Sequence, residues 1–298
     1  MSVTYRPRRE PRHEERTLRG LRHRLTWWGE PCESPIVLLH GFLDAGATWQ
    51  FLVDCLPDSW SFVAPDLRGC GGTERAPGGY WFPDYLADLE ALLDALVPNA
   101  PARLMGHSMG GNIASLYAGV RPDRVAWLVN LEGFGLPRTE PDQAAARFAE
   151  WLDQLRQGPR VSRYDSVERF AAVLRTRNPR LTLERSLFIA HAWTRPVENG
   201  VELAADPLHR LVNPVLYRRE EAESCWRRIK APSLLLIGEL SELRERLGAD
   251  GTEEALRAAF PGARLRTVPG VGHMMHHEDP QAVAERIVEF VAEQGNPR

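Results

Sequence analysis

Short apolar runs alternate with helical stretches through the first 133 residues of this chain. The apolar runs occupy residues 35–40, 61–67, 102–108 and 125–133, and compact runs of this kind are typical of buried strands. Apolar residues at helical spacing occupy the stretches between them, at 48–56, 82–96 and 112–120. Alternation at this pace predicts an α/β fold, a mostly parallel central sheet with helices on both faces.

The alternation stops at residue 134 and returns near residue 231. Residues 134–230 contain prolines and helical stretches but no convincing buried strand. We therefore predict a helical cap at 134–230, inserted into a core formed by residues 19–133 and 231–298. Residues 1–18 are polar and rich in arginine and glutamate, which predicts an N-terminal extension that is a solvated arm or an edge element.

Composition and charge exclude several classes of protein. The chain has 298 residues, is 43% hydrophobic and carries a net charge of −3, so no global field favours nucleic acid or an anionic membrane as a partner. No stretch approaches the ~18 apolar residues of a membrane span, and the N-terminus lacks the apolar segment of a signal peptide. The four cysteines form no CxxC pair and no metal-binding spacing with histidine. We expect a cytoplasmic protein with reduced thiols.

Residues 106–111 read GHSMGG and match the pattern G-x-S-x-G. A strand is predicted before this stretch and a helix after it, which is the context of a nucleophile elbow. Glycines allow the tight, strained turn that lifts a nucleophile clear of the sheet. Ser108 is therefore a candidate nucleophile at a helix N-terminus, where the helix dipole favours developing negative charge. The alternative is a serine that only caps a helix in a glycine-rich turn.

Further motifs follow other predicted strands, at the sheet edge where ligands bind in such folds. His40-Gly41-Phe42 follows the first strand, and the backbone N–H groups of Phe42 and Met109 are candidates for an oxyanion hole. His273 follows the last strand, where a general base for Ser108 is required.

The loop at 66–73 reads DLRGCGGT. We expect Asp66 and Arg68 to form hydrogen bonds that brace the neighbouring loops, because arginine cannot act as a general base.

With HGF at 40–42, DLRGCGGT at 66–73, GHSMGG at 106–111 and GVGHMMHHEDP at 270–280, the chain resembles the α/β-hydrolase superfamily. The resemblance covers residues 20–295. It implies a serine–acid–histidine triad in that chain order, with Ser108 as nucleophile and His273 as base. His276 and His277 are alternatives for the base. We expect His40 to be structural and the side chain of His107 to point away from the nucleophile.

The acid of this triad departs from the usual pattern. The superfamily most often carries an aspartate in G-x-x-D after the strand at 232–239, and this position holds Ser241, followed by Glu242. Some members carry the acid one strand earlier, where this chain has Glu132. A glutamate directly after a buried apolar run is costly unless it is paired. Glu132 is the first choice. Glu242, Glu239 and a site without an acid are the alternatives.

These residues predict a serine hydrolase that cleaves a small or medium hydrophobic carboxylic ester by two-step acyl transfer. Thioesters, lactones and amides stay open as substrates, and no metal or organic cofactor is required. A carbon–carbon hydrolase, an acyltransferase or a cofactor-free haloperoxidase-like enzyme would use the same triad. An inactive ligand-binding protein is the alternative outside enzymes. We expect some aromatic residues of the cap to line an apolar pocket. The candidates are Phe134, Phe148, Trp151, Tyr164, Phe170, Phe188, Trp193, Tyr217 and Trp226.

Overall fold

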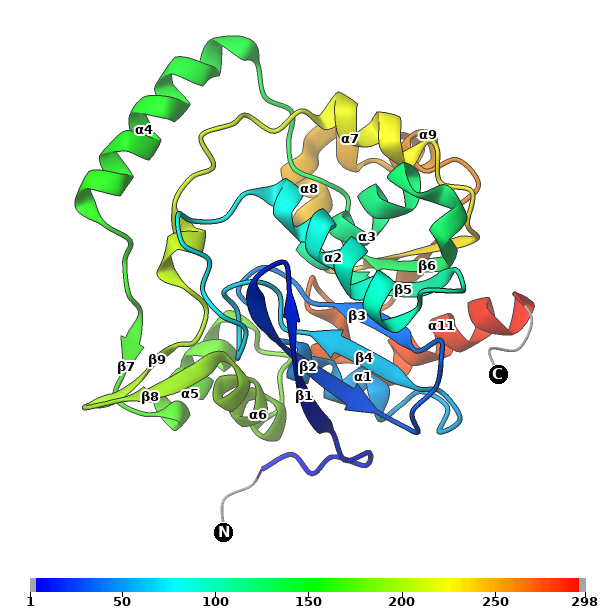
Figure 1. Ribbon diagram of the computed structural model, residues 1–298, viewed down its shortest axis with the longest axis horizontal. Coiled ribbons are helices and arrows are strands. Elements are labelled where there is room, and N and C mark those ends of the chain that lie inside the picture. Colours follow the sequence, from blue (N-terminus) through cyan, green and yellow to red (C-terminus); the bar gives the residue numbers. More distant parts are fainter. Residues whose placement is uncertain (1–3, 295–298) are drawn as a thin grey trace.

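The computed structural model describes residues 4–294 (Figure 1), so residues 1–3 of the predicted extension and 295–298 of the predicted core lie outside the described part. Its main feature is an eight-stranded sheet with the order β1-β2-β4-β3-β5-β6-β10-β11. The strands β4 to β11 of this order run parallel, and β1 and β2 form an antiparallel hairpin at one edge. The predicted α/β fold is confirmed. The strands are β1 (Arg12–Leu18), β2 (Leu21–Trp28), β3 (Ile36–Leu39), β4 (Phe62–Pro65), β5 (Ala102–His107), β6 (Val125–Leu131), β10 (Ser233–Gly238) and β11 (Arg264–Val268).

Helices cover both faces of the sheet because its central strands are apolar on both sides. In β10, Leu234 and Leu236 pack under α11, whereas Leu235 and Ile237 pack on the other face with α9, as the two-residue period of a strand requires. The helices α2 and α3 share this second face with α9. The helices of the core are α1 (Gln50–Val53), α2 (Phe82–Leu96), α3 (Met109–Val120), α8 (Leu243–Leu247), α9 (Glu253–Ala259), α10 (Met275–Glu278) and α11 (Pro280–Glu293).

The segment 134–230 contains a small sheet as well as helices, which differs from the all-helical segment that the sequence predicts. Three short strands pair in the order β7-β9-β8. They are short and only partly buried, so they lack the apolar runs that mark the strands of the core. The elements of this segment are α4 (Ala144–Gln157), β7 (Arg163–Tyr164), α5 (Val167–Arg177), α6 (Leu183–Trp193), β8 (Thr194–Val197), β9 (Gly200–Leu203) and α7 (Arg219–Trp226).

Two helices of this segment differ in how they are held. In α7, Trp226 is buried and stacks on Phe260 of the core, with ring centroids 4.7 Å apart. In contrast, α4 has no buried residue and stands apart from the other helices (Figure 1).

The described residues of the N-terminal extension are attached to the core. The prediction that this extension is a solvated arm is therefore wrong for these residues. The carboxylate of Asp54 accepts hydrogen bonds from the hydroxyl of Tyr5 and from the backbone N–H groups of Arg8 and Arg9. Residues 12–18 then form the edge strand β1. This strand contains six consecutive polar residues and so has no apolar run that would mark it in the sequence. Among the described residues, no helix has the length and apolar composition that crossing a bilayer requires.

Candidate active site

Ser108 lies in a strained turn between β5 and α3. Its backbone has φ 52° and ψ −115°, a region that costs a residue with a side chain roughly 1–3 kcal/mol. The neighbouring structure holds this conformation, because Ser108 N donates to the carbonyl oxygen of Leu131 at 2.8 Å and Asn112 N donates to the carbonyl oxygen of Ser108 at 2.9 Å. The turn presents the serine at the carboxyl edge of the sheet.

The two glycines of the motif are required by close backbone contacts. A Cβ atom at Gly110 would lie 2.0 Å from the carbonyl oxygen of Leu39, and one at Gly106 would lie 2.4 Å from the carbonyl oxygen of Gly110. Both separations are far below van der Waals contact, so neither position accepts a side chain in this turn.

The structure brings Ser108, His273 and Glu132 into one line of hydrogen bonds. The Nε2 atom of His273 lies 3.0 Å from Oγ of Ser108, and its Nδ1 atom lies 2.7 Å from Oε2 of Glu132. Three different strand ends supply the three residues: β5, β6 and β11. The side chain of His273 is 36% exposed, whereas that of Glu132 is fully buried, so solvent and small molecules reach the histidine but not the carboxylate.

Donors on the neighbouring β10 segment also satisfy the buried carboxylate of Glu132. The backbone N–H of Gly238 donates to Oε1 at 2.8 Å, and the hydroxyl of Ser241 donates to Oε2 at 2.6 Å. Burial of an ionised carboxylate is tolerated when such donors are present. The sequence alone assigned no function to Ser241. The feature that could have indicated one is that Ser241 occupies the position of the aspartate in the G-x-x-D pattern.

The structure places the alternative acids and bases elsewhere. Glu239 is exposed and accepts a hydrogen bond from Gly270 N, and Glu242 is exposed and pairs with Arg246. His276 and His277 are buried in α10 and have no hydrogen bond to Ser108.

The candidate oxyanion-hole residues lie at the starts of the two loops that flank Ser108. Met109 is the first residue of α3, and Phe42 lies in the turn after β3. Within residues 4–294, neither backbone N–H donates to another group of the protein. Two free donors beside a candidate nucleophile are the requirement for binding an oxyanion.

Two histidines beside the site have structural hydrogen bonds. The prediction for His40 is confirmed, because its Nε2 atom accepts the N–H of Leu67 at 2.9 Å. The Nε2 atom of His107 lies 2.8 Å from the carbonyl oxygen of His273 and donates to it, so this ring braces the backbone of the candidate base.

Polar contacts attach the segment 134–230 to the loops around Ser108. Trp193 Nε1 donates to Asp44 at 2.6 Å, and Asp206 accepts a hydrogen bond from Tyr80 at 2.9 Å. His209 stacks on Tyr80 with ring centroids 3.5 Å apart and contacts Phe42 edge-on at 6.2 Å. The loop that carries Phe42 therefore packs directly against this segment.

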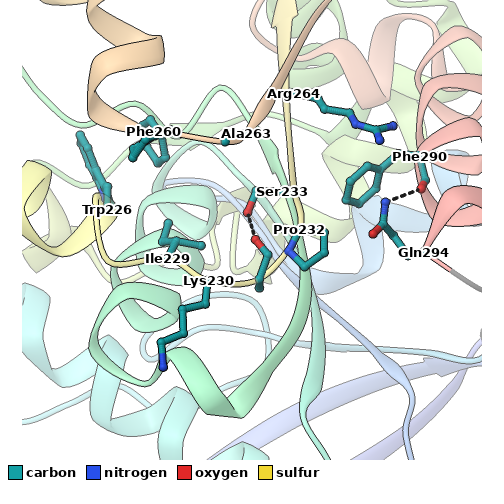
Figure 2. A pocket seen from close by; sticks show the side chains of 13 residues that line it. Trp226, Ile229, Lys230, Pro232, Ser233, Phe260, Ala263, Arg264, Phe290 and Gln294 are labelled. Atoms are coloured by element: carbon teal, nitrogen blue, oxygen red, sulfur yellow. Dashed lines mark hydrogen bonds between the residues drawn. The ribbon is translucent and has the colours of Figure 1, made fainter.

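A hollow of about 290 Å³ lies at the opposite end of the sheet from Ser108 (Figure 2). It is lined by Pro232 and Ser233 at the start of β10, by Arg264 at the start of β11, and by Phe290 of α11. In a parallel sheet, chemistry is located at the carboxyl ends of the strands, so this hollow is separate from the candidate site.

The chain belongs to the α/β hydrolase fold family, whose sequence profile matches residues 34–280. The confirmed sheet topology and the serine elbow agree with this membership.

Relatives with different activities share most of the chain. A serine hydrolase-like protein of Danio rerio is 27% identical over 90% of this chain and 84% of its own. A putative 2-succinyl-6-hydroxy-2,4-cyclohexadiene-1-carboxylate synthase of Bacillus subtilis is 27% identical over 91% and 95%. Among solved structures, a thioesterase domain from the curacin biosynthetic pathway has a TM-score of 0.79 and 28% identity, over 94% of this chain and 99% of that domain.

Protonation of His209 is expected to make the protein sensitive to acid. Burial lowers the pKa of His209 to about 4, with Asp206 opposing the shift, whereas the unfolded residue titrates near its ordinary value of about 6.5. Below pH 6.5 the unfolded state therefore binds more protons, and stability falls as the pH falls toward 4. Urea titrations at pH 7 and pH 5 give the free energy of unfolding at each pH. Between these values it should fall by about 2 kcal/mol more for the wild type than for His209→Gln. An equal loss of unfolding free energy in the two proteins would contradict the assignment of the acid sensitivity to His209.

Proposed function

We propose that this protein is a serine hydrolase that cleaves a small or medium hydrophobic carboxylic ester, or a related thioester or lactone. The observation that carries the proposal is the hydrogen-bonded line from Ser108 through His273 to Glu132, with separations of 3.0 and 2.7 Å. A nucleophile within reach of a base, which a buried acid orients in turn, is the arrangement that acyl transfer uses.

In the first step, Ser108 Oγ attacks the carbonyl carbon of the substrate and its proton passes to Nε2 of His273. Glu132 accepts the Nδ1–H, which selects the tautomer with a free lone pair on Nε2 and stabilises the imidazolium that forms. The N–H groups of Phe42 and Met109 bind the oxyanion. The carbon–oxygen bond to the alcohol then breaks, and His273 returns the proton to the leaving alcohol.

In the second step, water hydrolyses the acyl-enzyme. Nε2 of His273 takes a proton from the water as its oxygen attacks the acyl carbon, and the same two N–H groups bind the second oxyanion. The bond to Ser108 breaks, Oγ takes the proton back from His273, and the carboxylic acid leaves.

Exposed apolar side chains support a hydrophobic acyl group. Phe42 is 51% exposed although it lies in the loop proposed for the oxyanion. On α4, the exposed residues Phe148, Leu152 and Leu155 lie at the i, i+4 and i+7 positions of one helix face. We propose that the segment 134–230 acts as the cap of the site and that these apolar groups contact the substrate.

A fluorophosphonate probe tests whether Ser108 is an activated nucleophile. We expect stoichiometric labelling of the wild type and none of Ser108→Ala, because the probe reacts with activated serines. The control is Ser224→Ala, an exposed serine on α7, which should label like the wild type. Folded wild-type protein that does not label would favour a ligand-binding protein.

The identity of the acid is tested by two matched substitutions. Glu132→Gln should lower kcat by roughly four decades, because an amide at this place favours the wrong tautomer of His273. Glu242→Gln should leave kcat near the wild-type value, since its carboxylate pairs with Arg246 on the surface. A large loss in Glu242→Gln with full activity in Glu132→Gln would reverse the assignment.

A series of p-nitrophenyl esters of increasing acyl length tests the substrate class. If the acyl chain is buried, kcat/KM should rise about fourfold for each added methylene until the site is full, since each buried methylene contributes about 0.8 kcal/mol. A decline beyond the acetyl ester would contradict a hydrophobic acyl site. Absence of turnover for every ester, in protein that the fluorophosphonate labels, would favour carbon–carbon hydrolysis or acyl transfer.

A further inference from the structure

A cluster of buried polar side chains lies behind the proposed triad and has no part in the reaction. It consists of Asp44, His107, His276 and His277, none of which is more than 2% exposed. Its rings are close together: those of His107 and His276 are 4.3 Å apart, and those of His276 and His277 are 4.0 Å apart. We call these four residues the buried histidine cluster.

Possible ligand atoms of several side chains lie close together in this cluster. Ligand atoms of Asp44, His107 and His276 all lie within 4.8 Å of one another. Asp44 Oδ2, His107 Nδ1, both ring nitrogens of His276 and His277 Nε2 have no hydrogen-bond partner within the described part of the chain. Buried polar atoms are almost always satisfied in folded proteins, so these five atoms are open to a further partner.

The surroundings of Asp44 indicate what kind of group it is. Its Oδ1 accepts three hydrogen bonds, from the N–H of Ala45, the hydroxyl of Thr48 and the indole of Trp193. These donors are all neutral. The nearest ionisable partner of Oδ2 is Nε2 of His277, at 4.0 Å. A buried carboxylate is stable when a cation balances it or a metal binds it.

The histidines are prepared as ligands. The Nε2–H of His107 donates to the carbonyl oxygen of His273, which leaves the lone pair on its Nδ1. Such an outer hydrogen bond to a carbonyl is what orients most metal-binding histidines.

We propose that Asp44, His107 and His276 bind one first-row transition-metal dication, with His277 as the nearest further ligand. One carboxylate and neutral imidazoles are a donor set for Zn²⁺ and Co²⁺ rather than for Mg²⁺ or Ca²⁺. Three atoms within 4.8 Å of one another have a common centre no more than about 2.8 Å from each, against bonds of about 2.0–2.2 Å in zinc sites. Side-chain shifts of less than about 1 Å close the site.

Such an ion would join the three segments on which the proposed chemistry depends. Asp44 is two residues from Phe42, His107 precedes Ser108, and His276 is three residues from His273. The metal therefore has a positioning function, and it lies behind the reacting groups rather than among them.

The test uses untagged wild-type protein that has been stripped with a chelator and then loaded with Zn²⁺ or Co²⁺. We expect one ion per chain by elemental analysis after gel filtration and a melting temperature raised by Zn²⁺. An anomalous difference peak should lie between Asp44, His107 and His276 in crystals. X-ray absorption should show nitrogen and oxygen ligands only. Sulfur ligands would overturn the assignment in favour of a cysteine site, for example Cys70 beside His209.

Variants separate the cluster from the reaction centre. Asp44→Asn and His276→Gln should each weaken Zn²⁺ binding at least tenfold, whereas Ser108→Ala and the exposed control His191→Gln should bind like the wild type. Loss of binding in Ser108→Ala but not in Asp44→Asn would place the ion at the triad and overturn the proposal. Wild-type protein that binds no ion, with density for an ordered water in the cluster, would overturn it without any variant.

Discussion

The buried carboxylate of Glu132 is the constraint on which the arrangement of this site depends. An ionised group without exposure to solvent needs donors from every side, and here they come from different parts of the chain: Gly238 N, the hydroxyl of Ser241 and Nδ1 of His273. Glu132 directly follows β6, Gly238 is the last residue of β10 with Ser241 in the loop after it, and His273 lies in the loop after β11. One carboxylate therefore connects the carboxyl ends of three adjacent strands. The distances from His273 to both of its partners follow from this connection.

Strain at the elbow is compensated by the same sheet. Ser108 and Glu132 both have positive φ angles, 52° and 54°, and both lie where a central strand of the sheet ends. Such conformations persist only where the surroundings determine them. The carbonyl oxygen of Leu131 accepts the N–H of Ser108, and the carbonyl oxygen of Leu236 accepts the N–H of Glu132. The neighbouring strands thus stabilise both strained residues at the edge where the chemistry is proposed.

Most of the core could be predicted because its signals are local. Compact apolar runs marked five of the eight strands, β3, β4, β5, β6 and β10, and the glycines of GHSMGG marked the turn after β5. The N-terminal hairpin was missed because β1 reads RHEERTL, six polar residues in a row followed by one leucine, at the edge of the sheet. The small sheet at β7, β8 and β9 was missed because its strands have two to four residues and bury little. The attachment of residues 5–9 was missed because it depends on Asp54, about 45 residues away in the chain.

The sequence by itself determined the alternation of the central strands with the helices of the core and the turn that presents Ser108, since both follow from apolar periodicity and from glycine geometry within a few residues. It also placed His273 at the correct edge. Only the tertiary structure decided which glutamate meets His273, because that depends on β6 lying beside β10 across more than 100 residues of intervening chain. The buried histidine cluster is likewise decided only by the tertiary structure. Its donors come from three separate segments, so no spacing along the chain indicates that they meet.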